Sequence, residues 1–188
     1  LAGKSGAASV ENNEIYNNIF YGGFEQYGGE SQISGVIEIK LKNNDYTADI
    51  SGIKISNNIF LDWDIRSGGD ITASDYAIKI RDMSDNASIT IEEMENNLFW
   101  LSSGDPTSTK LIFHDGSTYT VAEYDSDKAW STGNLVSDPG LADPANDQFW
   151  PNAAGDDVVD AGTANTYSES GLKPTTTDKA AFQGGDDA

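Results

Sequence analysis

The sequence predicts an all-β fold in which a coiling chain stacks its strands in parallel. Two observations support this prediction. A short phrase recurs three times at nearly the same interval, and short segments between its copies alternate apolar and charged residues. A fixed interval of this size is typical of stacked repeats, and alternation with a period of two indicates half-buried strands. We therefore expect residues one interval apart to be neighbours on one surface.

The recurring phrase is a pair of asparagines followed by an apolar pair. Its copies, 40 and 39 residues apart, read Asn17-Asn18-Ile19-Phe20, Asn57-Asn58-Ile59-Phe60 and Asn96-Asn97-Leu98-Phe99. Asparagine tolerates the left-handed backbone of a tight corner, and its side-chain amide can stack on copies above and below. We expect Asn17, Asn57 and Asn96 to be structural residues at equivalent corners.

Strands are expected on both sides of each corner. Ile53-Lys54-Ile55 and Ile89-Thr90-Ile91 alternate before a corner, and residues 36–42 (VIEIKLK), 77–82 (AIKIRD) and 111–115 (LIFHD) form the strands between corners. The alternation predicts a set of core isoleucines: Ile37, Ile39, Ile53, Ile55, Ile78, Ile80, Ile89 and Ile91.

Other repeats of about 40 residues fit less well. Two or three strands per repeat are too few for a four-stranded propeller blade. The alternation disfavours helical repeats, and no convincing helix is visible because glycine pairs and Asn/Asp/Ser clusters interrupt the loops.

The phrases IYNNIF and IKISNNIF around the first two corners resemble turns of right-handed parallel β-helix proteins of the pectate-lyase-like superfamily. A later segment, with GNLVSDPGL at residues 133–141 and VVDAG at residues 158–162, is similar to the closing coils of secreted bacterial β-helix proteins. The resemblance implies a right-handed parallel β-helix (a solenoid) with long loops. It leaves the activity open, because this superfamily contains lyases, hydrolases, epimerases, adhesins and inert stalks.

We expect one domain with two parts. Residues 1–130 should form the coils. From residue 131 to residue 188 the composition shifts to Asp, Pro, Gly, Ala and Thr, so this segment should form an irregular C-terminal cap over the edge of the last coil. Three visible repeats suggest part of a longer β-helix, and either further coils of a parent chain or other copies of this chain are expected as stacking partners.

The composition restricts the possible partners. The net charge is −20, from 31 acidic and 11 basic residues, which argues against nucleic acids and anionic membranes. No apolar run is long enough for membrane insertion. The lack of cysteine excludes disulfides, thiol catalysis and Cys-ligated zinc. A secreted or cell-surface location is expected.

Basic residues gather in the middle of the chain. Six of the eleven lie between residues 40 and 81: Lys40, Lys42, Lys54, Arg66, Lys79 and Arg81. If Ile37 stacks on Ile78 and Leu111, then Lys40, Arg81 and His114 form one outward column, with strands about 4.8 Å apart. Such a column suits an acidic polysaccharide.

Two kinds of site follow from this column. In β-elimination of a uronate, Lys, Arg and His can neutralise the carboxylate, remove the C5 proton and protonate the leaving oxygen. Lys40, Arg81 and His114 are therefore the catalytic candidates, and Lys42, Lys54, Lys79 and Arg66 the substrate-binding candidates. The structural alternative is that these cations pair with Glu38, Glu92 or Asp82 across strands.

A calcium site is a further hypothesis. Asp125-Ser126-Asp127 resembles the start of a calcium loop, without the glycine and distal glutamate of an EF-hand. The resemblance implies that calcium often neutralises the carboxylate in related lyases.

Three functions remain open at this point. The chain binds, or supports action on, an acidic polysaccharide; or it is a polyuronate lyase in its own right; or it is a non-catalytic adhesin or filament subunit.

Overall fold

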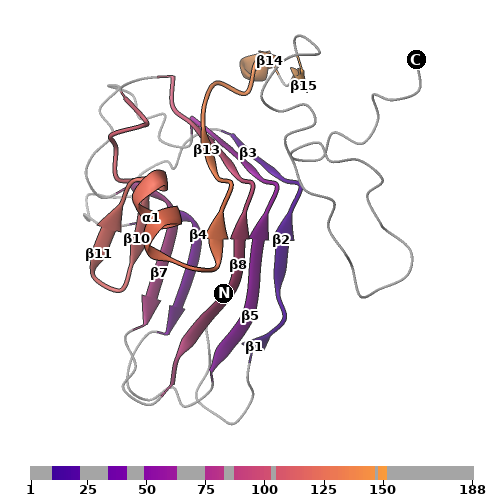
Figure 1. The fold of residues 1–188 in the computed structure, drawn as a ribbon. Coiled ribbons are helices and arrows are strands. Elements are labelled where there is room, and N and C mark those ends of the chain that lie inside the picture. Colours follow the sequence, from indigo (N-terminus) through magenta and orange to yellow (C-terminus); the bar gives the residue numbers. More distant parts are fainter. Residues whose placement is uncertain are drawn as a thin grey trace, which may run out of the picture.

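The structure, a computed structural model, describes residues 10–21, 34–41, 49–62, 75–82, 87–102, 105–146 and 148–151. Most elements in these residues are β-strands, and most strands belong to three sheets, which we call sheets 1 to 3 (Figure 1). The prediction of an all-β class is therefore confirmed for the described residues.

The strands of each sheet come from successive repeats of the chain. Sheet 1 contains β1 (Val10–Glu11), β2 (Glu14–Tyr16), β5 (Ile50–Ser56), β8 (Ile89–Glu95) and β12 (Ser131–Thr132). Sheet 2 contains β3 (Ile19–Tyr21), β6 (Ile59–Leu61), β9 (Leu98–Trp100) and β13 (Leu135–Val136). Sheet 3 contains β4 (Ser34–Leu41), β7 (Asp75–Asp82), β10 (Ile112–His114) and β11 (Ser117–Tyr119).

The chain visits sheets 1, 2 and 3 in the same order each time, and we call one such circuit a pass. Strands of successive passes pair in parallel, and only β11 joins sheet 3 antiparallel to its neighbour β10. Antiparallel hairpins between the repeats, which would have contradicted the predicted stacking, are absent from the pairings of the described strands.

The asparagine corners lie between sheets 1 and 2. Asn17, Asn57 and Asn96 have φ angles of 56°, 55° and 53°, so they share the left-handed conformation predicted for equivalent corners. Gly133, with φ of 66°, takes the same place in a fourth pass. A Cβ atom on Gly133 would lie 2.5 Å from Asn96 Oδ1, which explains why glycine replaces asparagine there.

A row of side-chain amides connects the four passes. We call Asn18, Asn58, Asn97 and Asn134 the amide ladder, because each Nδ2 donates to the Oδ1 of the next member at 2.9 to 3.0 Å. The backbone N–H groups of the first three members donate to the same oxygens. Asn134 Nδ2 donates to Asp125 Oδ1 at 2.6 Å, and the ladder ends there because a carboxylate only accepts.

The core lies between the three sheets. Seven of the eight predicted isoleucines are buried, and Ile89 is half-buried against the same cluster. Three phenylalanines form a stack on the core side of sheet 2: Phe20 and Phe60 have ring centroids 5.0 Å apart, and Phe60 and Phe99 4.8 Å apart. The period of the corner phrase thus places identical rings over one another.

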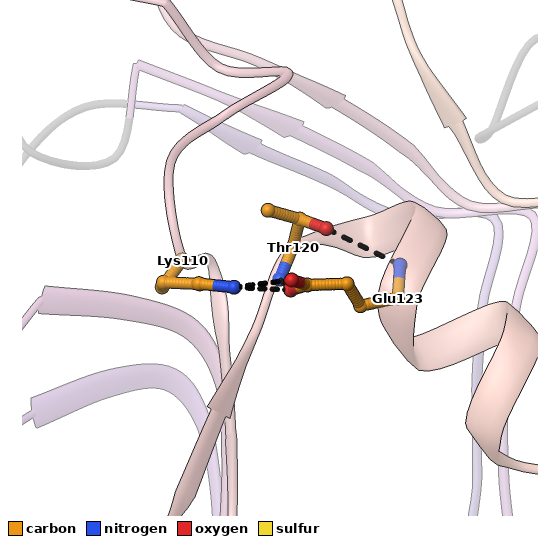
Figure 2. Close-up of polar contacts among 3 residues, drawn as sticks. All are labelled: Lys110, Thr120 and Glu123. Carbon is orange, nitrogen blue, oxygen red and sulfur yellow. Dashed lines mark hydrogen bonds and ion pairs between the residues drawn. The ribbon is translucent and has the colours of Figure 1, made fainter.

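One helix, α1 (Val121–Asp127), contradicts the expectation that the chain has no helix. Its start is fixed by a capping box, in which Thr120 Oγ1 accepts from the Glu123 N–H and the Glu123 carboxylate accepts from the Thr120 N–H. Lys110 Nζ also contacts this carboxylate, and Figure 2 shows the three residues converging at the start of the helix.

Two described strands of sheets 1 and 2 lie beyond residue 130, where the coils were predicted to end and the cap to begin. Strands β12 and β13 continue sheets 1 and 2 in register with β8 and β9, so the repeat extends to Val136. Helix α1 covers one end of the core, with Val121 and Tyr124 buried in the main cluster (Figure 1).

The described residues beyond Val136 lie outside sheets 1 to 3. They include the antiparallel pair β14 (Leu141–Asp143) and β15 (Gln148–Pro151) and the short 3-10 helix η1 (Pro144–Asn146). Leu141 packs on the face of sheet 2 that points away from the core, against a cluster containing Ile59, Leu61 and Leu98. Phe149 meets the edge of the Tyr21 ring on β3, with centroids 5.6 Å apart.

Candidate functional site

The candidate site is a group of charged residues on the outer face of sheet 3. In the register of β4 and β7, Glu38 lies opposite Lys79 and Lys40 lies opposite Arg81. The residues between them, such as Ile39 and Ile80, point into the core, so the four charged side chains share the opposite face. We call Glu38, Lys40, Lys79 and Arg81 the basic face.

Glu38 lies between the two lysines of the basic face. Its Oε1 is 3.3 Å from Lys79 Nζ, and its Oε2 is 2.8 Å from Lys40 Nζ. The Lys79 side chain is only 1% exposed, whereas that of Lys40 is 36% exposed. Lys79 is therefore a buried partner of Glu38, and Lys40 is a partly exposed one.

The sequence makes room for the buried lysine at Gly35. A Cβ atom there would lie 2.8 Å from Lys79 Cβ, closer than such contacts allow. On the other side, Phe113 of β10 lies opposite Lys79 in the register, and its ring is 5.4 Å from that of buried Tyr76. An open backbone and neighbouring aromatic side chains thus surround the Lys79 stem.

Burial and charge act in opposite directions on these groups. Burial lowers the pKa of Lys79, the Glu38 carboxylate opposes this effect, and the charges of Arg81 and Lys40 lower the pKa further. Burial alone would raise the pKa of Glu38, but the hydrogen bond from Lys40 and the charges of both lysines outweigh it and lower the pKa. The basic face thus combines three basic residues with one acidic residue.

His114 does not join the basic face, so the predicted column of Lys40, Arg81 and His114 is wrong. His114 lies opposite Ile80, one position away from the expected place opposite Arg81. At the start of this pairing, the N–H groups of Ala77 and Ile78 both approach the Leu111 carbonyl, at 2.8 and 3.4 Å. A shift of one residue moves a side chain to the other face of a sheet.

His114 instead belongs to a cluster beside α1. Its Nδ1 is 2.8 Å from Tyr124 Oη, and its Nε2 is 3.4 Å from Asp115 Oδ2. Burial lowers the pKa of His114, although the charge of Asp115 opposes this, so the neutral ring is favoured. Burial also raises the pKa of the Tyr124 hydroxyl well above its usual range. These contacts give His114 a packing role.

The other predicted binding residues lie elsewhere. Lys54 lies on β5 and therefore in sheet 1, not on the basic face of sheet 3. Its Nζ is 3.4 Å from a Glu92 oxygen and 3.9 Å from a Glu93 oxygen. Its contact with Glu92 and that of Lys79 with Glu38 confirm the predicted cross-strand pairing. Lys42 and Arg66 lie outside the described residues.

The two aspartates of the predicted calcium loop have protein partners. Asp125 accepts from Ser131 Oγ and from the Asn134 backbone and side chain, so it closes the amide ladder. Asp127 is 2.8 Å from Lys128 Nζ, and this hydrogen bond lowers its pKa. In the part of the chain that the structure describes, no three His, Cys, Asp or Glu side chains gather as a metal site. Calcium at this loop therefore stays a prediction.

Sequence reasoning missed the ladder partners. The second asparagine of each pair, not the first, donates along the ladder, and Gly133-Asn134 is its fourth copy. The available signal was the distance of 37 residues between Asn97 and Asn134, close to the two earlier intervals.

Comparison with known proteins gives no relative: no protein-family model, curated protein or solved structure matches the chain. Among the described residues, no helix has the length and apolar character needed to cross a membrane.

Proposed function

We propose that the chain winds as a right-handed parallel β-helix of the pectate-lyase-like kind, and that its basic face binds an acidic polysaccharide. The cyclic order of the three sheets and their parallel pairing support the first part. The observation that carries the second part is the register of β4 and β7, which places Lys40 opposite Arg81 beside Glu38, whose carboxylate contacts both Lys40 and Lys79.

The arrangement suits a flat, repeating anion. Lys40 and Arg81 project from adjacent strands about 4.8 Å apart, so two cations can contact one carboxylate or successive sugar units. Arginine offers a planar fork for a carboxylate, and lysine a mobile point charge. In a chain with net charge −20, an excess of positive charge on one face would direct a polyanion to it. Such a ligand fits a secreted or cell-surface protein.

A lyase is the weaker candidate. The lowered pKa of Lys79 favours a role as a base, but a side chain that is 1% exposed cannot reach a substrate proton in this conformation. His114, the third member of the proposed catalytic group, lies on the other face of sheet 3. Binding therefore requires fewer changes to the described geometry than β-elimination does.

A binding titration with polygalacturonate and with alginate at low salt tests the proposal. The double variant Lys40→Ala/Arg81→Ala should bind about 100-fold more weakly or worse, because each of the two lost hydrogen bonds to a charged group contributes roughly 1.5–3 kcal/mol. The control variant Lys54→Ala/Lys110→Ala removes the same charge from other surfaces and should bind like wild type. Added salt should weaken binding by wild type.

Three results would change the conclusion. Equal affinity of the double variant and wild type would leave only a structural or adhesive role. Equal affinity for an uncharged glucan would remove the electrostatic basis. Release of an unsaturated, ultraviolet-absorbing product by wild type, but not by the double variant, would establish the lyase instead.

A further inference from the structure

A second candidate site lies at the ends of the sheet 2 strands, on a different sheet from the basic face. A cavity of about 250 Å³ opens there between sheet 2 and the segment that contains β14 and η1. Tyr21, Leu61 and Trp100 line it from the sheet side. They are the last residues of β3, β6 and β9 and lie opposite one another in the register, so Leu61 lies between the two aromatic residues.

These three residues face away from the main core. Leu61 belongs to the outer cluster of sheet 2, and Tyr21 and Trp100 pack against that cluster together with Leu141. The Phe stack occupies the other face. The cavity is therefore formed by the outer face of sheet 2 and by the C-terminal segment that lies on it, and both aromatic residues remain partly exposed.

Three carboxylates complete the wall: Asp62, Asp138 and Asp143. Each uses one oxygen in a hydrogen bond within the chain. Asp62 Oδ1 accepts from the Ser102 N–H at 2.6 Å, Asp138 Oδ1 from the Gly140 N–H at 2.9 Å, and Asp143 Oδ2 from Asn146 Nδ2 at 2.8 Å. The described structure gives the second oxygen of each no hydrogen bond, and no Lys, Arg or His lines the cavity within the described residues.

We propose that this cavity binds an organic cation through its ammonium group. Tyr21 and Trp100 lie one strand to either side of Leu61, and neighbouring strands are about 4.8 Å apart. An ammonium group held over Leu61 would therefore have an aromatic side chain on each side, and cation–π contacts extend to roughly 6 Å. The carboxylates supply compensating charge and acceptors. The same charge would repel the acidic polysaccharide proposed for the basic face, so the two sites require different ligands.

The size of the cavity restricts the ligand to a small headgroup. Pockets for drug-sized molecules occupy roughly 300–1,000 Å³, which is more than this cavity offers. A quaternary ammonium, as in choline, and the primary ammonium of an amino sugar share the required chemistry. They differ in hydrogen bonding, since only the primary ammonium can donate to the free carboxylate oxygens.

Calorimetric or NMR titrations with four small molecules test the proposal. Choline is compared with its uncharged tert-butyl analogue, and glucosamine with N-acetylglucosamine. At least one ammonium compound should bind saturably, and its uncharged counterpart should bind about tenfold more weakly or not at all. Preference for choline or for glucosamine identifies which ammonium type the site takes. Equal binding of the charged and uncharged members, or saturation by none of the four, would overturn the proposal.

Two variants locate the binding. Trp100→Leu keeps an apolar side chain against the outer cluster but removes the π face, and it should weaken binding by about five- to tenfold. Asp62→Asn keeps the acceptor for Ser102 and removes one charge, and should also weaken binding. The matched control is Asp49→Asn, because Asp49 likewise accepts a backbone hydrogen bond one pass later, from Ser88 at 2.8 Å. Unchanged affinity in both Trp100→Leu and Asp62→Asn would exclude this cavity.

Discussion

Replacing Asn97 by alanine should be the most damaging single change to the amide ladder. Asn97 is fully buried in the third pass. Its Oδ1 accepts from the Asn58 backbone N–H and from Asn58 Nδ2, at 3.1 and 3.0 Å. Its Nδ2 donates to the Ile55 carbonyl and to Asn134 Oδ1, both at 2.9 Å. The substitution removes all four hydrogen bonds at once and cuts the ladder in its middle.

The cost follows from the number and burial of these bonds. A typical internal hydrogen bond contributes about 1 kcal/mol net, and an unsatisfied buried donor costs roughly 1–3 kcal/mol. Losing four bonds and leaving the buried Asn58 N–H without this acceptor should therefore lower the free energy of unfolding by roughly 5–7 kcal/mol. Asn18→Ala is the matched comparison at the first pass, where only the bonds from Nδ2 to Asn58 Oδ1 and to the Tyr16 carbonyl are lost.

Urea denaturation of both variants, followed by circular dichroism at neutral pH, measures the difference. The Asn18→Ala variant should lose about 1–2 kcal/mol, less than half the loss at Asn97. Equal losses, or a loss below about 1 kcal/mol at Asn97, would refute the claim that the ladder stabilises the stacked passes.

Three further predictions concern titrating groups and the helix start. His114 is protonated near pH 6.5 in the unfolded chain, above the lowered pKa of the folded state, so the free energy of unfolding should fall as the pH drops from 7 to 5. If a His114→Gln variant lost stability equally steeply over this range in urea titrations, the prediction would be wrong. Glu38→Gln leaves the Lys79 ammonium buried without its counter-charge, so the substitution should lower the stability by about 3 kcal/mol at pH 7. The loss should become smaller toward pH 10, because the folded state releases the Lys79 proton at a lower pH than the unfolded state does. A loss that does not change with pH would contradict this prediction. Thr120→Ala should lower the stability by about 1 kcal/mol in thermal unfolding. The Lys110 hydrogen bond lowers the pKa of Glu123 to about 2, so the stabilisation by the Glu123 carboxylate should persist down to about pH 4.5 and disappear toward pH 2. Loss of this stabilisation already at pH 5 would contradict the capping role of Glu123.

The sequence was sufficient where one pattern determines both the element and its register. The spacing of Asn17, Asn57 and Asn96 identified the corners, and the alternation in residues 37–41 and 78–82 predicted the pairing of Ile37 with Ile78 and of Lys40 with Arg81. Because a strand with one buried face has its register fixed by its apolar residues, these pairings follow from the residues alone.

The predicted register was wrong for β10, where it differs from the observed register by one residue. In LIFHD, residues 111–115, either Leu111 or Ile112 satisfies the apolar pattern, and the choice depends on how Ala77 and Ile78 share the Leu111 carbonyl. That contact joins segments more than 30 residues apart, so the alternation within each segment cannot reveal it. As a result, His114 was predicted on the outer face of sheet 3, whereas it lies on the core side.

Burial at the basic face was equally hidden from the sequence. Lys79 alternates with Ile78 and Ile80 as an exposed residue would, yet its side chain is 1% exposed. The reason lies in its neighbours on other strands: Glu38 supplies the counter-charge, Gly35 the space and Phe113 an adjacent ring. The cavity beside Trp100 also depends on a distant segment, residues 138–145, that folds onto sheet 2.

An NMR titration of the isotopically labelled protein with an oligogalacturonate locates the ligand on the chain. If the basic face binds the polysaccharide, the largest saturable shift changes should occur in Glu38–Leu41 and Lys79–Asp82 and should vanish in Lys40→Ala/Arg81→Ala. Saturable changes centred on other residues, or identical changes in wild type and the double variant, would contradict it.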